Sequence, residues 1–341
     1  MLNTHEALLR NRDSLSGQVA LLGLSDAAVL ASLPCDGGLV QTDHFGIYGG
    51  WSALSRWQPV FGYSSEALAE SAFDCVVVFM PKSRPELEMR LALAQHLAKA
   101  GGTLMLIGEK KEGISGGAKI FKIALPQAFK TDSARHCQVW EGAAPEGAQA
   151  FRLDDRQQWH TIEASGTTVD VAGLPGIFSD GRLDDGTALL LSTFDKLPVG
   201  PVLDFACGAG VIGAWLASQV PNLKVDAVDV QSQAVACAEA TFARLGDGVE
   251  ARAWASDGLS DVEGRYQLLV SNPPFHAGIR TDTTMTESFI RSAAQHLEKG
   301  GELRLVANRF LPYLDWIRRY VGPCEILAED RRFNVYRAYR R

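Results

Sequence analysis

The stretch PVLDFACGAGVIGAWLASQV, residues 201–220, decides the fold of this chain. Its apolar beginning predicts a buried strand over 201–206, and residues 207–220 form a glycine-rich turn that enters a helix. Small residues in such a turn let a ligand approach the backbone, and the start of the following helix presents free N–H groups. The stretch therefore predicts a strand–turn–helix unit that can hold a ligand.

The rest of the second half continues this alternation. Strands are predicted over 224–230, 249–257, 266–272, 302–308 and 334–341. Helices are predicted over 232–246 and 286–301, and the second is expected to end at a glycine C-cap. This pattern is typical of a parallel, doubly wound α/β sheet, in which ligands lie at the carboxyl ends of the strands.

Two segments of the first half parallel two segments of the second. FDCVVVFMPKSRPE (73–86) matches YQLLVSNPPFHAGI (266–279), and LAQHLAKAGGTLMLIGEK (93–110) matches AAQHLEKGGELRLVANRF (293–310). Coincidence between two similar α/β units is the alternative, but residue identity and element order agree together. We therefore expect two copies of one fold. The N-terminal copy is degenerate, because its first strand lacks closely spaced glycines.

Length and composition agree with two domains. The chain has 341 residues, and EGAAPEGAQA (141–150) has the composition of a linker, which predicts domains at 1–145 and 146–341. The longest apolar runs are of strand length, and the N-terminus has no secretory pattern, so no membrane span or signal is expected. Six cysteines without a CxxC pair indicate reduced thiols in the cytoplasm and no bound metal.

The charge distribution leaves room for a nucleic-acid partner. The formal net charge is −7, which by itself disfavours binding to a polyanion, yet residues 304–341 contain nine arginines against four acids. Local basic patches can bind nucleic acid on an acidic protein. Lys82, Lys130 and Arg135 are candidate phosphate contacts, with ordinary solvated charge as the alternative for each.

An acid stands at the end of three successive predicted strands. Asp204 precedes the glycines, where it suits an amino-bearing cation such as S-adenosyl-L-methionine (SAM) and would repel the pyrophosphate of the competing dinucleotide ligands. Asp229 can hold both ribose hydroxyls, and Asp257 can accept a hydrogen bond from the adenine amino group. The alternative is that these acids only cap the following helices.

The segment SNPPFH, residues 271–276, ends the fourth of these strands. The side-chain oxygen of Asn272 and the carbonyl of Pro273 can accept the two hydrogens of an amino nitrogen while a methyl group approaches it. Pro274 fixes the turn, and Phe275 offers a stacking face for a base. His276 can take up the released proton, although an ordinary loop histidine is the alternative. A turn that only ends a strand is the alternative for the whole motif.

The segment PGIFSDGRLDDGTALLL, residues 175–191, precedes the glycine-rich unit. Phe178 and Asp184 are candidates for one wall of a cofactor pocket. The alternative is an ordinary capped helix over 185–191.

DFACGAG, Asp229, SNPPFH and the paired N-terminal copy together resemble the class I SAM-dependent methyltransferases. More narrowly, the whole chain resembles the bacterial 16S ribosomal RNA guanine-N2 methyltransferases. The resemblance implies two Rossmann-like methyltransferase domains, of which only the C-terminal one binds SAM. It also implies methylation of N2 of guanosine 1207 in 16S rRNA, within the assembled small subunit. A monomer is expected.

Site roles can be carried over from this resemblance. Asp204, Gly208 and Gly210 would line SAM, Asp229 would hold its ribose, and Asp257 would face the adenine. Residues 272–275 would hold the guanine. Ala206 stands where the family commonly has the first glycine of DxGCG, and we expect SAM binding to survive with a slightly shifted loop.

Three other functions compete with this one. A related 23S rRNA guanine-N2 methyltransferase shares the duplicated layout. A glutamine methyltransferase of release factors normally has tyrosine after NPP and a helical N-terminal domain, whereas this chain has Phe275 and an α/β copy. A non-catalytic RNA-binding or assembly protein is disfavoured by the intact Asn272 and glycine-rich loop.

Overall fold

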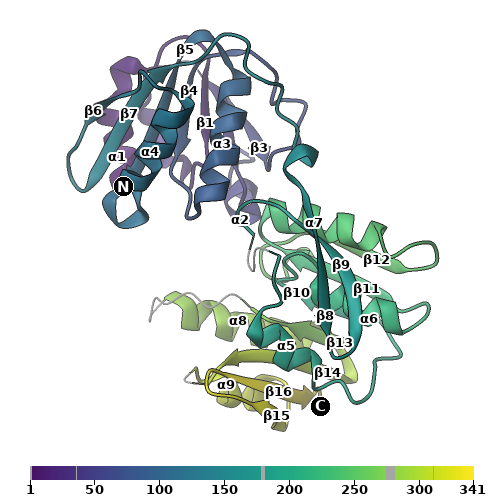
Figure 1. Cartoon of the computed structure of the whole chain (residues 1–341). Coiled ribbons are helices and arrows are strands. Elements are labelled where there is room, and N and C mark those ends of the chain that lie inside the picture. The colour runs from purple at the N-terminus through teal and green to yellow at the C-terminus, as the bar shows by residue number, and fades with distance from the viewer. Residues whose placement is uncertain (1, 36, 178–180, 274–280, 310) are drawn as a thin grey trace. The chain divides into compact units, whose positions relative to one another are not determined.

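The computed structural model describes residues 2–35, 37–177, 181–273, 281–309 and 311–341. The chain divides into two units, Met1–Arg156 and Gln157–Arg341 (Figure 1). The first unit extends beyond the predicted boundary at 145, because Phe151 and Leu153 pack against its hydrophobic core. The start of the predicted linker is strand β7, which runs to Ala143.

The second unit is built on a seven-stranded sheet with the order β12-β11-β10-β13-β14-β16-β15. The strands of this unit are β8 (Gln158–Ala164), β9 (Thr167–Gly173), β10 (Val202–Phe205), β11 (Lys224–Asp229), β12 (Glu250–Ala255), β13 (Tyr266–Ser271), β14 (Leu297–Asn308), β15 (Cys324–Glu329) and β16 (Phe333–Tyr339). The helices are α5 (Asp185–Leu191), α6 (Val211–Gln219), α7 (Ser232–Ala243), α8 (Thr281–His296) and α9 (Tyr313–Tyr320).

The sheet of the second unit is mixed, so the prediction of an all-parallel sheet needs correction. Strands β12, β11, β10, β13 and β14 are parallel, whereas β16 is antiparallel to both β14 and β15. Strands β15 and β16 are joined by a short turn, and a connection that short can only link antiparallel strands. Strand β15, helix α9 and the β8–β9 ribbon were not predicted from the sequence patterns.

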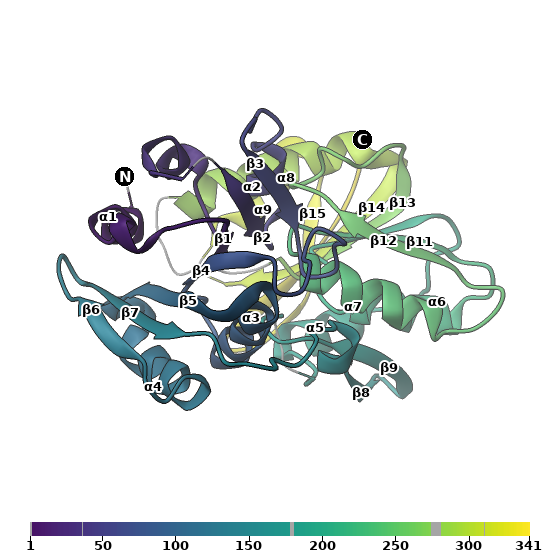
Figure 2. The same ribbon diagram turned by 90° about the horizontal axis from the view of Figure 1, so that it is seen from above.

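Helices cover both faces of this sheet. Helices α5, α6 and α7 share one core with Val225, Leu268 and Val270, and α8 and α9 share another with Leu203 and Leu269. Neighbouring strand residues therefore point to opposite cores, as the pleat requires. The β8–β9 ribbon lies against α6 and α7 (Figures 1 and 2), where the Trp215 indole donates to the Ala164 carbonyl at 2.8 Å.

The first unit has the same topology, β3-β2-β1-β4-β5-β7-β6, with parallel pairs up to β5 and antiparallel pairs beyond it. Its strands are β1 (Val19–Leu22), β2 (Gly38–Thr42), β3 (Trp57–Phe61), β4 (Phe73–Phe79), β5 (Ala98–Glu109), β6 (Phe129–Asp132) and β7 (Cys137–Ala143). Its α-helices are α1 (Asn3–Arg10), α2 (Phe45–Gly49), α3 (Arg84–Leu97) and α4 (Ile114–Ala124). The prediction of two copies of one fold is confirmed.

Strand pairing shows which residues of the two units are equivalent. Leu22 pairs with Val78 in the first unit and Phe205 pairs with Ser271 in the second. Phe79 and Asn272 therefore stand at equivalent positions, each one residue beyond the equivalent pair. Phe79 is buried in a hydrophobic core, where its ring lies 5.8 Å from that of His5.

The Gly-Gly pair shared by the two repeats has a structural role. Gly101 and Gly300 adopt left-handed φ values of +74° and +76°. A Cβ on Gly102 or Gly301 would come within 2.9 Å of two backbone carbonyl oxygens. The pair is not the predicted helix C-cap, because α8 ends at His296 and the glycines lie within β14. They form the irregularity at which pairing with the neighbouring strand shifts.

Three further features concern membrane spans, the cysteines and metal binding. Among the described residues, no helix combines the length and apolarity needed to cross a membrane. All six cysteines are free thiols. The same described part of the chain contains no group of His, Cys, Asp and Glu side chains arranged to hold a metal ion.

Candidate functional site

The glycine-rich loop joins β10 to α6 at the carboxyl edge of the sheet. Asp204 lies inside β10 and has no exposed surface. Its Oδ2 accepts a hydrogen bond from the Gly213 N–H at 3.0 Å, and its buried Oδ1 has no partner among the described atoms. Burial raises the pKa of Asp204 to about 7. The carboxyl group therefore supports the loop and the first turn of α6 from beneath.

Ala206 carries the strain of this loop. Its φ is +56°, in the left-handed region that L-residues other than glycine rarely adopt, and Gly208 and Gly210 follow with φ of +54° and +78°. An alanine in this region is less stable than in the right-handed region by roughly 1–2 kcal/mol. From the sequence we expected a slightly shifted loop at Ala206. The positive φ adds a local energetic cost at this residue.

We predict that Ala206→Gly raises the free energy of unfolding by about 1 kcal/mol, because glycine adopts this φ without a Cβ clash. Urea denaturation measures the change. Ala209→Gly, in the same loop but without a positive φ, is the control and should not stabilise the chain. Equal effects of the two substitutions would contradict the assignment of strain to residue 206.

Asp229 ties the loop to the next strand. It ends β11, its Oδ2 accepts from the Gly208 N–H at 3.0 Å, and its Oδ1 accepts from the Gln231 N–H at 3.0 Å. A Cβ on Gly208 would meet nothing within 4 Å, so the space beside this glycine is open. The next candidate acid, Asp257, is exposed just beyond β12, where its backbone carbonyl accepts from the Ser260 hydroxyl at 2.8 Å.

Asn272 follows β13 and is held by two side chains from the segment before β10. Its amide nitrogen donates to Asp184 Oδ2 and to Thr187 Oγ1, both at 2.8 Å. Because a carboxylate can only accept, Asp184 fixes which way the amide faces. Both hydrogen bonds of the NH₂ group are therefore made to protein side chains. The side-chain oxygen of Asn272 is the atom of the amide that remains to accept a hydrogen bond from a substrate.

Asp184 also caps the helix that carries Thr187. Its Oδ2 accepts from the Thr187 N–H at 3.0 Å, and α5 begins at the next residue, as the capped-helix alternative predicted. Thr187 was not predicted from the sequence as a site residue. Its position three residues after a helix-capping acid is a usable signal, but only the fold brings α5 against the end of β13.

Four of the predicted site residues fall outside the described residues; they are Phe178, Pro274, Phe275 and His276. Pro273 is described, and it is buried two residues beyond the end of β13.

The three basic candidates of the first unit do not form one cluster of unpaired charges. Lys82 is exposed before α3, and Lys130 is exposed in β6, with its ammonium 6.0 Å from the centre of the Trp140 ring. Arg135 forms an ion pair with Glu6. Of the three, Arg135 is the least available to an outside phosphate.

The equivalent edge of the first unit is filled by its own arginine. The guanidinium of Arg90, from α3, donates to the Tyr63 hydroxyl (3.1 Å), the Phe79 carbonyl (2.9 Å), Asp43 (3.1 Å) and Glu86 (2.6 Å). These partners, Glu86 excepted, follow or end strands β2, β3 and β4. A Cβ on Gly23, just after β1, would lie 1.9 Å from the Arg90 Nη1 atom.

Comparison with known proteins places this site in a family. The profile of the methyltransferase small domain matches residues 168–337, and that of its N-terminal domain matches residues 5–160. A Hahella chejuensis protein named ribosomal RNA small subunit methyltransferase C is 38% identical over 99% of this chain and 98% of its own length. The chain belongs to the ribosomal RNA small subunit methyltransferase C family. A Pseudomonas syringae member is 40% identical over 98% of both chains.

A solved structure shares the fold of this family member. The T. thermophilus 16S rRNA N2 G1207 methyltransferase (RsmC), in complex with AdoMet and guanosine, superimposes with a TM-score of 0.85. The match covers 99% of this chain and 92% of the other, at 22% identity. The predicted fold class, two tandem Rossmann-like methyltransferase domains, is therefore confirmed for this member of the methyltransferase C family.

Proposed function

We propose that this chain transfers a methyl group from SAM to the exocyclic N2 amine of a guanosine in 16S rRNA, position 1207 by family resemblance. The observation that carries the proposal is the oriented Asn272 amide beside an open glycine loop, in a chain 38–40% identical to methyltransferase C proteins over nearly its whole length. The 23S rRNA guanine remains the alternative target.

The residues of the second unit suit SAM in two respects. The partnerless, buried Asp204 Oδ1 can accept a hydrogen bond from a ligand or water entering the loop. The open space at Gly208 lets a ligand reach the backbone, with Asp229 beside it for the ribose hydroxyls and exposed Asp257 for the adenine. When bound, SAM supplies an electrophilic methyl group on a sulfonium centre.

The chain's own residues act on the target amine. The Asn272 oxygen and the Pro273 carbonyl accept its two hydrogens, which helps the nitrogen to pyramidalise. Asp184 and Thr187 hold the Asn272 amide in that orientation. Direct in-line transfer then depends mainly on proximity and alignment. For Phe275 as stacking face, Pro274 as turn former and His276 as proton acceptor, the support is the sequence motif.

The first unit supplies no second methyl-transfer site in this proposal. Its counterpart of Asn272 is Phe79, and Arg90 occupies the edge at which the second unit has its open loop. We assign it to folding and to docking on the small ribosomal subunit. We further propose that the protein works in the cytoplasm as a monomer.

The experiment maps N2-methylguanosine in rRNA from a strain whose own methyltransferase C gene is deleted. Complementation with this chain should restore one modified guanosine in 16S rRNA, and complementation with Asn272→Ala should not. A restored modification in 23S rRNA would favour the alternative target. Failure of the purified chain to bind SAM in a calorimetric titration would instead favour a non-catalytic RNA-binding protein.

A further inference from the structure

The basic segment 304–341 separates into two groups of arginines in the folded chain. Four of its nine arginines form ion pairs with acids of the same unit. These pairs are Arg304–Glu302 (2.5 Å), Arg309–Glu329 (3.6 Å), Arg332–Asp185 (3.2 Å) and Arg337–Glu325 (2.7 Å). Four others gather elsewhere, around a hollow of about 380 Å³; they are Arg318, Arg319, Arg340 and Arg341. We call this feature the arginine hollow.

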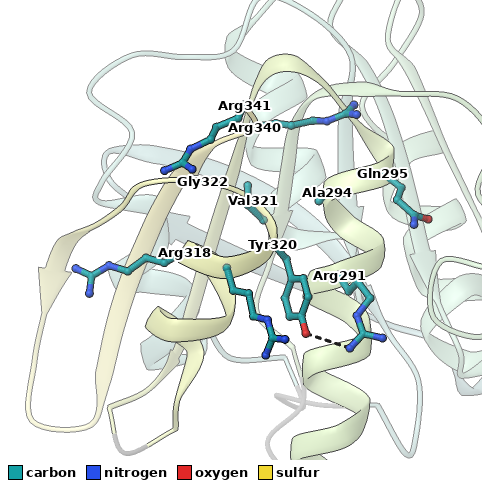
Figure 3. A pocket seen from close by; sticks show the side chains of 10 residues that line it. Arg291, Ala294, Gln295, Arg318, Tyr320, Val321, Gly322, Arg340 and Arg341 are labelled. Carbon is teal, nitrogen blue, oxygen red and sulfur yellow. Dashed lines mark hydrogen bonds between the residues drawn. The ribbon is translucent and has the colours of Figure 1, made fainter.

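The arginine hollow combines three separate segments of the chain. Arg318 and Arg319 lie in the last turn of α9. Arg340 and Arg341 follow β16, and Arg291 and Gln295 come from α8 (Figure 3). Within the described part of the chain, none of the four arginines that define the hollow has an acid partner. Glu287, whose carboxylate pairs with Arg291 at 3.4 Å, also accepts from the Tyr320 hydroxyl at 2.5 Å.

The hollow lies at the edge of the sheet opposite Asn272. The Arg340 N–H donates to the Gly301 carbonyl at 2.8 Å, near the start of the paired part of β14. Asn272 follows Ser271, which pairs with Leu305 near the other end of that strand. The six residues of β13 span roughly 20 Å. A ligand of the hollow is therefore separate from the reacting base by about one strand length.

The geometry points to an extended polyanion rather than a single small anion. Figure 3 shows the side chains of Arg318, Arg340 and Arg341 pointing in different directions around the hollow, so one phosphate could not reach all of them. Arginine forks bind phosphate oxygens in pairs. Resting on the proposed function, we infer that the arginine hollow holds the phosphodiester backbone of the RNA substrate, away from the methylated guanosine.

The test compares two double charge reversals. Arg318→Glu/Arg319→Glu changes the hollow, and Lys196→Glu/Lys224→Glu makes the same change in charge at two exposed lysines of the same unit that lie outside it. The hollow variant should raise KM for unmethylated small subunits at least about tenfold, with kcat and the SAM Kd within twofold of wild type. The lysine variant should change KM by less than threefold.

A binding measurement keeps this inference independent of methyl transfer. The measurement is the binding of a protein-free 16S rRNA fragment to Arg318→Ala/Arg319→Ala. The logarithm of the association constant decreases with the logarithm of the salt concentration, and in the variant this slope should be less steep by about 1.5, as expected for two lost phosphate contacts. This result supports the inference even if no guanosine is methylated. An unchanged slope overturns the inference even if methylation proceeds. Weakened binding to subunits with unchanged binding to protein-free RNA also overturns it, because the occupant would then be a ribosomal protein.

Discussion

Replacing Asn272 by alanine should lower kcat for methyl transfer about 10²- to 10³-fold and leave the Kd for SAM within twofold of wild type. The substitution removes an acceptor that acts on the amine as the methyl group approaches, and loss of one such preorganised group has effects of this size. A contact used mainly in the transition state changes kcat and kcat/KM together. Single-turnover kinetics on small ribosomal subunits measures the rate, and calorimetry measures the Kd.

Thr187→Val provides a graded companion to Asn272→Ala. It removes one of the two hydrogen bonds that orient the amide, at similar side-chain volume, while Asp184 keeps the other. A single hydrogen bond contributes about 0.5–1.5 kcal/mol, so kcat should fall roughly 2- to 13-fold.

If Asn272→Ala instead abolishes SAM binding, Asn272 belongs to the cofactor side of the site and our assignment is wrong.

Replacing Arg90 by alanine should destabilise the first unit by about 3–5 kcal/mol. Removing one partner of a buried ion pair leaves the other charge buried without compensation. Here Asp43, Glu86, the Tyr63 hydroxyl and the Phe79 carbonyl would all lose the same donor. Hydrogen exchange by mass spectrometry on the full chain should show faster exchange in peptides of 2–156 and unchanged exchange in peptides of the second unit.

The same helix offers a matched control for Arg90→Ala. Arg84 and Glu88 form another pair four residues apart in α3, at 3.1 Å, but their side chains are 71% and 49% exposed, against 5% and 7% for Arg90 and Glu86. Arg84→Ala should cost no more than about 0.5 kcal/mol, because solvent screens exposed pairs. Similar costs for both substitutions would show that burial does not determine the effect.

The cost of Arg90→Ala should also depend on pH. Burial raises the pKa of Glu86, and Arg90 opposes that rise. Without Arg90, the pKa of Glu86 in the folded state rises further above its value in the unfolded state. The protonated carboxyl then favours the folded state at low pH, and this contribution is lost as the pH rises through the folded-state pKa. The variant should therefore lose less stability at pH 5 than at pH 8, relative to wild type.

The sequence by itself determined that the chain has two α/β units built on one repeated fold, and it singled out the motifs from which we predict the site. The sequence features behind these predictions are local patterns. They are the 201–220 stretch, the polar residues Asp229 and Asn272 at the ends of predicted strands, and the repeated segments with their Gly-Gly pair. Local patterns specify strands, helices and turns directly, because side-chain periodicity and backbone φ are properties of neighbouring residues. The match of residues 73–86 with residues 266–279 puts Phe79 at the position of Asn272, and strand register confirms the equivalence.

Only the tertiary structure decided which residues act on one another across the chain. Thr187 and Asp184 reach Asn272 because α5 packs at the end of β13, and Arg90 reaches partners that follow three different strands. The nine arginines of 304–341 look alike in sequence, yet the fold pairs four with acids and gathers four around a hollow. Such contacts join residues far apart in the chain, and no local pattern encodes a distance between them.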